Sequence, residues 1–152
     1  MSIYEQHLDR RPANFVPLSP VSFLVRAARV YGSRVAVIDG QRRYTYAQFF
    51  ERARRLASAL AHAGVGEGDT VAIVAPNTPE MLEAHYAVPM LGAVLCAINF
   101  RLDAPAVAFI LQHSEAKFVL VDHEFGSVAD RALAQIDGGP RSLNIQDEYE
   151  AF

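Results

Sequence analysis

The sequence predicts an α/β fold, a parallel sheet with helices on both faces, and two observations lead to it. Val71–Ala75 and Ala93–Ile98 are apolar runs without polar alternation, the pattern of strands that are buried on both faces. Between them, apolar residues from Met81 to Leu91 recur at helical spacing. Because parallel strands require a crossover connection, this order of strand, helix and strand predicts a βαβ unit.

A third apolar run of strand length covers Phe118–Val121. We therefore expect a three-stranded parallel core, with Val71–Ala75 as a central strand. Thr78 or Asn77 should cap the intervening helix, whose first residue is Pro79, because a proline in the first turn loses no hydrogen bond there.

Before this core, the sequence predicts a helix, a hairpin and a second helix. Ser19 and Pro20 have the pattern of an N-cap followed by a first-turn proline. The segments Val35–Asp39 and Arg42–Tyr46 flank a turn that contains glycine, which predicts a β-hairpin. Thr45 is the expected N-cap of the second helix, which carries one apolar stripe.

After the βαβ unit, Asp103 should cap a helix that ends near His113. A last helix is expected over Val128–Ile136, before a pair of glycines. The residues from Arg141 on alternate in character, but we expect no partner for them in the chain. These patterns divide the chain into an extended N-terminal arm (1–20), an α/β unit (21–140) and a C-terminal tail (141–152).

Composition limits the class of protein. The 152 residues are 51% hydrophobic and 20% charged with a net charge of −3, which suits one globular domain and gives no basic excess for nucleic acid. Eight arginines between residues 26 and 55 are interpreted as solvated helix faces. The N-terminus lacks a signal-peptide pattern and no apolar run reaches membrane-spanning length, so we expect a cytoplasmic protein.

Three patterns with a known chemical use are weak here. Cys96 is the single cysteine, which excludes an internal disulfide and favours a buried structural thiol over a reactive one. The pair Gly64-x-Gly66 follows a helix and opens a strand, the reverse of a dinucleotide fingerprint. The five histidines have no metal-site spacing, so structural or surface roles are expected for them.

A series of segments follows in a recognisable order: TY, an amphipathic helix, GVGEGD, VAIVAPNTPE, GAVLCAINFRL, a long helix and AKFVLVD. This order resembles the N-terminal subdomain of the adenylate-forming acyl-CoA synthetases, the AMP-dependent synthetase and ligase family. The resemblance extends from about Asn14 to Phe125. Within this family, the sequence is most similar to members that activate short- and medium-chain fatty acids or aryl acids.

The resemblance implies a partial N-terminal subdomain of an acyl-CoA synthetase-like fold. Full-length members are expected to use ATP and Mg to form an acyl-adenylate and then to pass the acyl group to CoA. Such an enzyme must hold the ATP phosphates in a Ser/Thr/Gly-rich loop that ends in a lysine, and this sequence contains no such loop. We therefore expect no catalytic residue, cofactor-binding residue or metal ligand in this chain, and no ligase activity from the chain alone.

Asn99 and Arg101 are the candidates for a site-supporting role, because in the family this Asn-x-Arg-Leu segment borders the larger N-terminal domain. An interdomain salt bridge of Arg101 is the rival interpretation. Asp122 follows a strand at the end where α/β sheets bind ligands, although a loop cap would place it there too. Glu80 and Glu83 form no acid/base pair with it that the sequence reveals.

Two classes of function stay open at this point. The chain is either the N-terminal portion of an acyl-CoA synthetase or a non-catalytic binding or interaction module derived from that fold. The expected partners are the remainder of a synthetase, or a second copy that associates through an exposed sheet edge.

Overall fold

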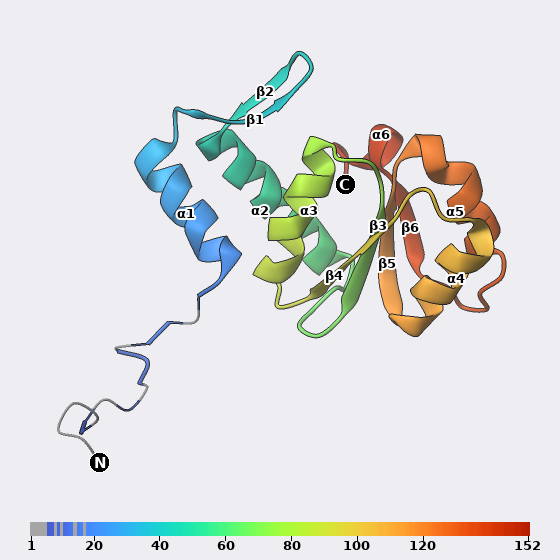
Figure 1. The fold of residues 1–152 in the computed structure, drawn as a ribbon, viewed down its shortest axis with the longest axis horizontal. Coiled ribbons are helices and arrows are strands. Elements are labelled where there is room, and N and C mark those ends of the chain that lie inside the picture. Colours follow the sequence, from blue (N-terminus) through green and yellow to red (C-terminus); the bar gives the residue numbers. More distant parts are fainter. Residues whose placement is uncertain (1–5, 8, 10, 14, 17) are drawn as a thin grey trace.

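The computed structural model describes residues 6–7, 9, 11–13, 15–16 and 18–152, and it shows an α/β fold in layers (Figure 1). Part of the expected N-terminal arm, at residues 1–5, 8, 10, 14 and 17, lies outside the described residues. The elements in chain order are α1 (Pro20–Tyr31), β1 (Val35–Asp39), β2 (Arg42–Thr45), α2 (Tyr46–His62), β3 (Thr70–Val74), α3 (Pro79–Met90), β4 (Val94–Ile98), α4 (Ala104–His113), β5 (Ala116–Val121), the 3-10 turn η2 (His123–Phe125), α5 (Gly126–Leu133), β6 (Arg141–Asn144) and α6 (Ile145–Glu148).

The main sheet is parallel throughout, with the strand order β4-β3-β5-β6. The prediction of three parallel strands is confirmed, and β3 lies between β4 and β5 as expected of a central strand. Val71 of β3 pairs with Leu95 on one side and with Phe118 on the other. Both neighbours of β3 therefore satisfy its backbone, and its apolar side chains fill the core on both faces.

The expectation that residues after 140 have no partner in the chain is wrong. Residues 141–144 form β6, which pairs with β5 so that Leu143 lies opposite Leu120. Leu143 is buried against the same cluster as Leu120. One apolar side chain in a polar segment gave too weak a pattern to predict a strand, yet it is enough when a neighbouring strand offers its backbone.

The interpretation of β4 as a strand buried on both faces is also wrong. Among the described residues β4 has one strand neighbour, β3, and its side chains range from exposed Val94 to buried Ile98. The side chain of Val94 is 55% exposed. An apolar run therefore predicted the strand but not its position at the edge of the sheet.

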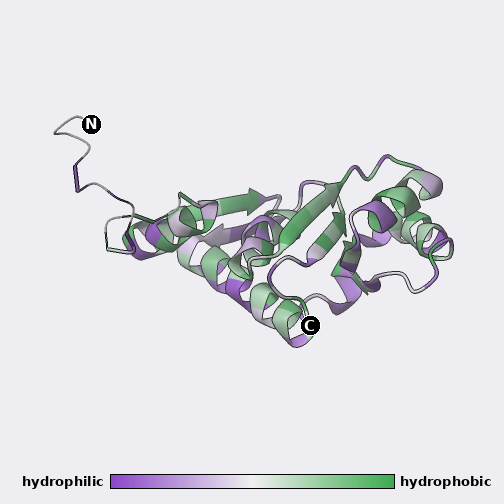
Figure 2. Ribbon diagram, turned by 90° about the horizontal axis from the view of Figure 1, so that it is seen from below, coloured by the Kyte–Doolittle hydropathy of each residue, from purple (hydrophilic) through white to green (hydrophobic). Residues whose placement is uncertain are grey.

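Two apolar layers sandwich the sheet, and Figure 2 shows its strands as largely hydrophobic while the helices carry both kinds of residue. On one face α2 and α3 pack against β3, β5 and β6. On the other face α4 and α5 pack against β3, β4 and β5. The prediction of helices on both faces is confirmed.

Helix α1 and the hairpin lie outside the α2–α3 layer (Figure 1). A small cluster joins them to it, in which Leu24 of α1 meets Phe49 and Ala53 of α2. The ring of Phe49 also contacts Tyr86 of α3 edge-on, with centroids 5.4 Å apart. This aromatic contact adds about 0.5–1.5 kcal/mol to the burial of apolar area.

The predicted N-caps are confirmed at all four helices. The side chains of Ser19, Thr45, Thr78 and Asp103 each accept a backbone N–H in the first turn. Thr45 forms a reciprocal capping box with Gln48, because each side chain binds the other residue's N–H. These caps satisfy donors that an uncapped helix end would leave without partners.

The hairpin and the last predicted helix differ in how well the sequence predicted them. The hairpin is confirmed, and Gly40 takes φ = 55° in its turn, a left-handed conformation that favours glycine. The last predicted helix is shifted, since α5 spans Gly126–Leu133 and the turn η2 comes before it. Asp122 caps that turn, and α5 then begins at Gly126, two residues before Val128, where the apolar period begins.

Candidate functional site

The carboxyl ends of the parallel strands are the place where an α/β sheet of this kind binds ligands. Helix α3 leads from β3 to β4 on one face, whereas α5 leads from β5 to β6 on the other. The chain therefore turns in opposite directions after β3 and after β5, which are neighbours. This reversal places the segment after Val74 and the segment after Val121 on the two sides of a topological switch point.

Asp122 stands at the switch point, and both of its carboxylate oxygens are occupied within the fold. Oδ1 accepts the N–H of Glu124 at 3.0 Å, and Oδ2 accepts Nε2 of Gln146 at 2.6 Å. The backbone N–H of Asp122 donates to the carbonyl of Val74 at 2.9 Å. Asp122 is 4% exposed and is a loop cap that ties β5, β3 and α6 together.

The structure places Asn99 and Arg101 in an exposed turn after β4. Oδ1 of Asn99 accepts the N–H of Arg101 at 3.0 Å, and the carbonyl of Asn99 accepts the N–H of Leu102 at 3.2 Å. The guanidinium of Arg101 lies over the Phe100 ring, 5.4 Å from its centroid. Asn99 therefore shapes the turn that presents Arg101, and a site-supporting role for the two residues stays a prediction.

Sequence reasoning missed a buried group of charges between α2, α3 and the end of the chain. Glu83 of α3 is fully buried, and its Oε1 accepts Nε of Arg52 at 2.5 Å. Its Oε2 accepts the Tyr149 hydroxyl at 2.6 Å. Arg52 also binds Glu150 at 2.7 Å and lies over the Tyr44 ring at 4.8 Å. We call Arg52, Glu83, Tyr149 and, at its exposed end, Glu150 the buried charge network.

The electrostatics of this network follow from burial. Burial raises the pKa of Glu83, and the hydrogen bonds from Arg52 and Tyr149 oppose that rise. Burial and the neighbouring Glu83 carboxylate raise the pKa of the Tyr149 hydroxyl. Burial lowers the pKa of Arg52, but its hydrogen bonds to Glu150 and Glu83 outweigh this and leave that pKa raised. Arg52 is therefore a permanent cation that holds two carboxylates.

One sequence signal could have revealed the network. Glu83 lies between Met81 and Ala84 on the helix and one turn before Ala87, and all of these positions are buried. A carboxylate on the apolar stripe of a helix needs a partner, because an unpaired buried charge is costly. Its partners are 31 and 66 positions away in the chain, so the sequence could not identify them.

A second carboxylate of α3 anchors the hairpin. Oε1 of Glu80 accepts Nη1 of Arg42 at 2.6 Å, and Arg42 also binds Asp39 at 2.5 Å. Hydrogen bonds to Asp39 and Glu80 raise the pKa of Arg42. Two neighbouring carboxylates of α3 thus fix the hairpin on one side and the end of the chain on the other.

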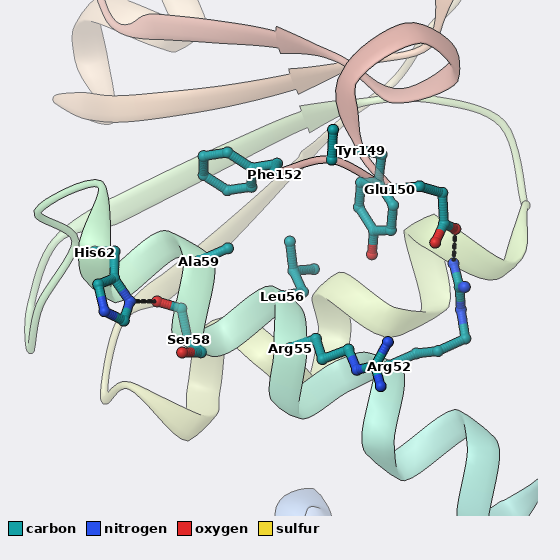
Figure 3. Close-up of a pocket in the computed structure, with 10 residues that line it drawn as sticks. Arg52, Arg55, Leu56, Ser58, Ala59, His62, Tyr149, Glu150 and Phe152 are labelled. Atoms are coloured by element: carbon teal, nitrogen blue, oxygen red, sulfur yellow. Dashed lines mark hydrogen bonds and ion pairs between the residues drawn. The ribbon is translucent and has the colours of Figure 1, made fainter.

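The buried charge network borders a hollow of about 400 Å³ between α2 and the last residues (Figure 3). Arg55 and His62 line it with Arg52, and Leu56 and Phe152 supply apolar walls. The His62 ring is held by the Ser58 carbonyl, with Nδ1 and O 2.7 Å apart. A larger hollow of about 510 Å³ lies between α1, β1 and the start of α3.

Metal-site geometry is not seen in the part of the chain that the structure describes, where no three His, Cys, Asp or Glu side chains gather to hold an ion. Cys96, expected to be buried, is half-exposed on the edge strand. Within the described residues, no helix is both long and apolar enough to cross a membrane.

The parallel sheet with its hairpin and two helical layers defines the class of protein: an α/β unit like the N-terminal domains of acyl-CoA synthetases. A fatty acyl-CoA synthetase of Mycobacterium tuberculosis is 32% identical with a TM-score of 0.79, over 86% of this chain and 27% of that one. A benzoate-CoA ligase of Burkholderia xenovorans is 27% identical with a TM-score of 0.77, over 82% of this chain and 25% of that one.

The sequence comparisons identify the family. The model described as "AMP-binding enzyme" matches residues 24–148, and the chain belongs to this family. A peroxisomal acetate/butyrate-CoA ligase of Arabidopsis thaliana is 53% identical over 126 residues, which are 83% of this chain and 22% of that protein. An acetate-CoA ligase of Humulus lupulus is 50% identical over the same shares. The chain therefore spans less than a quarter of the length of these two relatives.

Proposed function

We propose that this chain is the N-terminal portion of an acyl-CoA synthetase that joins a carboxylic acid to CoA through an acyl-adenylate. The observation that carries the proposal is the family match over residues 24–148, together with 53% identity to an acetate/butyrate-CoA ligase. The whole enzyme would use ATP, Mg and CoA. Its substrate would be a short- or medium-chain fatty acid or an aryl acid, which agrees with the acetate, butyrate and benzoate ligases among the relatives.

The chain alone would not catalyse the reaction. Its glycine clusters at Gly64–Gly68 and Gly138–Gly139 lack the hydroxyl residues and the lysine of a phosphate loop. Lys117, the single lysine of the sequence, is paired with Asp69 at 2.9 Å on the surface. The sequence therefore lacks the glycine-rich loop with a lysine that the proposed reaction requires at the pyrophosphate leaving group.

A chimera tests this proposal. The matched segment of the Arabidopsis acetate/butyrate-CoA ligase is replaced by residues 24–148 of this chain, and pyrophosphate release is measured with acetate, butyrate, benzoate and CoA. We expect the chimera to retain ligase activity and the 152-residue chain alone to show none. A folded chimera without activity, or turnover by the chain alone, would contradict the proposal.

Within the proposed enzyme, Asn99 and Arg101 would support the site by presenting the turn after β4 to the rest of the synthetase. In the chimera, Arg101→Ala should lower kcat/KM while the matched change Arg131→Ala, at another exposed arginine, leaves it unchanged. Loss of stability without loss of kcat/KM would favour an interdomain salt bridge instead. The proposed partners are the remainder of the synthetase and, for the chain alone, a second copy at a sheet edge.

A second candidate function is a non-catalytic binding module, favoured by the hollow of about 510 Å³ beside α1 and α3. A chain that is monomeric at high concentration and unfolds cooperatively would support this module. We also propose a cytoplasmic location, although several relatives are described as peroxisomal. Fluorescence microscopy of the tagged chain, in cells with a peroxisomal marker, distinguishes these two locations.

A further inference from the structure

Strand β4 presents an open edge with no charged side chain. It runs Val-Leu-Cys-Ala-Ile and has a single strand neighbour among the described residues. An exposed strand of this kind offers a row of unpaired N–H and C=O groups to another strand. Proteins usually protect such an edge with charges, proline or a bulge, and β4 carries none of these.

The other edges are protected. Strand β6 follows Pro140, starts with exposed Arg141 and has exposed Ser142. In the hairpin, β2 carries two exposed arginines, and the pairing of β1 shifts at a bulge between Val35 and Val37. Of the strand edges that the structure describes, β4 is therefore the one that lacks a device against pairing.

The direction of the free backbone groups on β4 follows from one hydrogen bond. The N–H of Val94 donates to the carbonyl of Asp69, at the start of β3, over 2.8 Å. Backbone groups alternate in direction along a strand, so those of Cys96 point toward β3 as well. The N–H and C=O groups of Leu95 and Ala97 therefore point outward, away from β3.

We propose that a second copy of this chain pairs with β4 in antiparallel orientation, about a two-fold axis at Cys96. This inference rests on the proposed self-association at a sheet edge and specifies its strand and register. Each Leu95 then exchanges hydrogen bonds with the Ala97 of the other copy, because their groups point outward. The two Cys96 residues form the central non-hydrogen-bonded pair, with Cα atoms about 4.5 Å apart.

Two arguments favour this occupant and this register. A two-fold pairing is self-complementary, and every pair across the axis is apolar: Val94 with Ile98, Leu95 with Ala97, and Cys96 with itself. No like charges meet, and all five residues of the strand find a partner. Two short strands bury less area than a standard protein interface, so the dimer should be reversible and depend on concentration.

The first test measures mass by light scattering over a dilution series. Ala97→Lys places a charge on the exposed edge of β4, and Ser142→Lys places the same charge on the exposed edge of β6. We expect the unmodified chain and Ser142→Lys to double their mass as concentration rises, while Ala97→Lys stays monomeric. Circular dichroism shows that each variant is folded. Monomers throughout, or a dimer lost only in Ser142→Lys, would overturn the inference.

The second test uses the unmodified chain as its main sample. Copper phenanthroline with oxygen takes two electrons and two protons from a pair of thiols, and a cross-strand disulfide requires Cα atoms about 4.4–6.8 Å apart. The unmodified chain should give a Cys96-linked dimer as its main species on a non-reducing gel. The variant Cys96→Ser with Ser142→Cys should give at least about tenfold less. A dimer in light scattering without this cross-link would overturn the register and leave self-association intact. The chimera's ligase activity is independent of both results.

Discussion

The two faces of the sheet are built on different principles. The α4–α5 face is held by apolar side chains such as Val107 and Leu111. The α2–α3 face also has an apolar layer, but the buried charge network lies within it and reaches the end of the chain. Apolar packing supplies energy with little directional preference, whereas a buried ion pair tolerates one geometry. We therefore expect the α2–α3 face to fix the relative position of its elements and the α4–α5 face to supply mainly stability.

The largest expected effect on stability comes from removing Arg52, the cation of the α2–α3 face. Arg52→Met should lower the free energy of unfolding by about 3–5 kcal/mol, because it leaves Glu83 buried without its cation. Adding Glu83→Leu should restore most of the loss, since a well-packed apolar pair can replace a buried ion pair. The matched control is Arg54→Met, an exposed arginine of the same helix, with an expected change within about 0.5 kcal/mol. Urea unfolding measures all three, and an additive double variant would show that the network is not coupled.

The corresponding change on the α4–α5 face should show a plain loss of packing. Leu111→Ala should cost about 2–5 kcal/mol, because the side chain is 2% exposed and leaves a cavity. Phe109→Ala on the same helix removes a side chain that is 65% exposed, so its effect should stay near about 0.5 kcal/mol. If thermal unfolding found the two costs equal, α4 would present a different side to the sheet.

Tyr149→Phe tests one hydrogen bond of the buried charge network. It removes the hydroxyl that donates to Glu83 and should cost about 1.5 kcal/mol at pH 8. The loss also raises the pKa of Glu83 further, because one of the bonds that opposed the effect of burial is gone. A carboxyl with a raised folded-state pKa stabilises the fold below its unfolded pKa of about 4.3 and loses that contribution as pH rises.

The penalty of Tyr149→Phe should therefore shrink at pH 4 relative to pH 8. Urea titrations at the two pH values measure it. Tyr31→Phe serves as the control because Tyr31 is 47% exposed, and it should show no such difference. A penalty that is independent of pH would mean that the hydroxyl acts through packing alone.

The smallest expected effect lies on the surface, at Asp69 and Lys117. The hydrogen bond from Lys117, with that from the Gly66 N–H, lowers the pKa of Asp69. Its contribution to stability is present above the unfolded pKa of about 3.9 and is lost as pH falls through the lower folded value. Lys117→Met should therefore weaken the fold slightly at pH 7 and not at all at strongly acid pH. Unfolding at low and high salt checks this, since salt should remove the difference.

The sequence predicted those parts of the fold that local patterns encode. The N-caps at Thr45 and Asp103 and the central strand Val71–Ala75 needed only neighbouring residues, and they are confirmed. The position of β4 at an edge and the pairing of Leu143 depend on which strands are neighbours, and an apolar run does not contain that information.

The site was predictable to a smaller extent. Asn99 and Arg101 were expected to follow the second strand because of the family resemblance, and the structure shows that Asn99 shapes the turn there. The pairing of Glu83 with Arg52 and Tyr149 joins distant segments, so nothing near Glu83 in the sequence predicts it. A carboxylate on the apolar face of a helix is the one signal in the sequence that a buried partner lies elsewhere in the chain.

The capping box at Thr45 also has a mechanical consequence. Strand β2 ends at Thr45 and α2 begins at Tyr46, so no loop separates them, and the paired bonds with Gln48 resist rotation at the junction. We therefore expect the hairpin and the 17-residue helix, which is about 25 Å long, to move together as one rigid unit. Because Arg42, beside the Gly40 turn, also binds Glu80 of α3, a displacement of the hairpin tip would reach both of the helices that hold the Arg52–Glu83 pair.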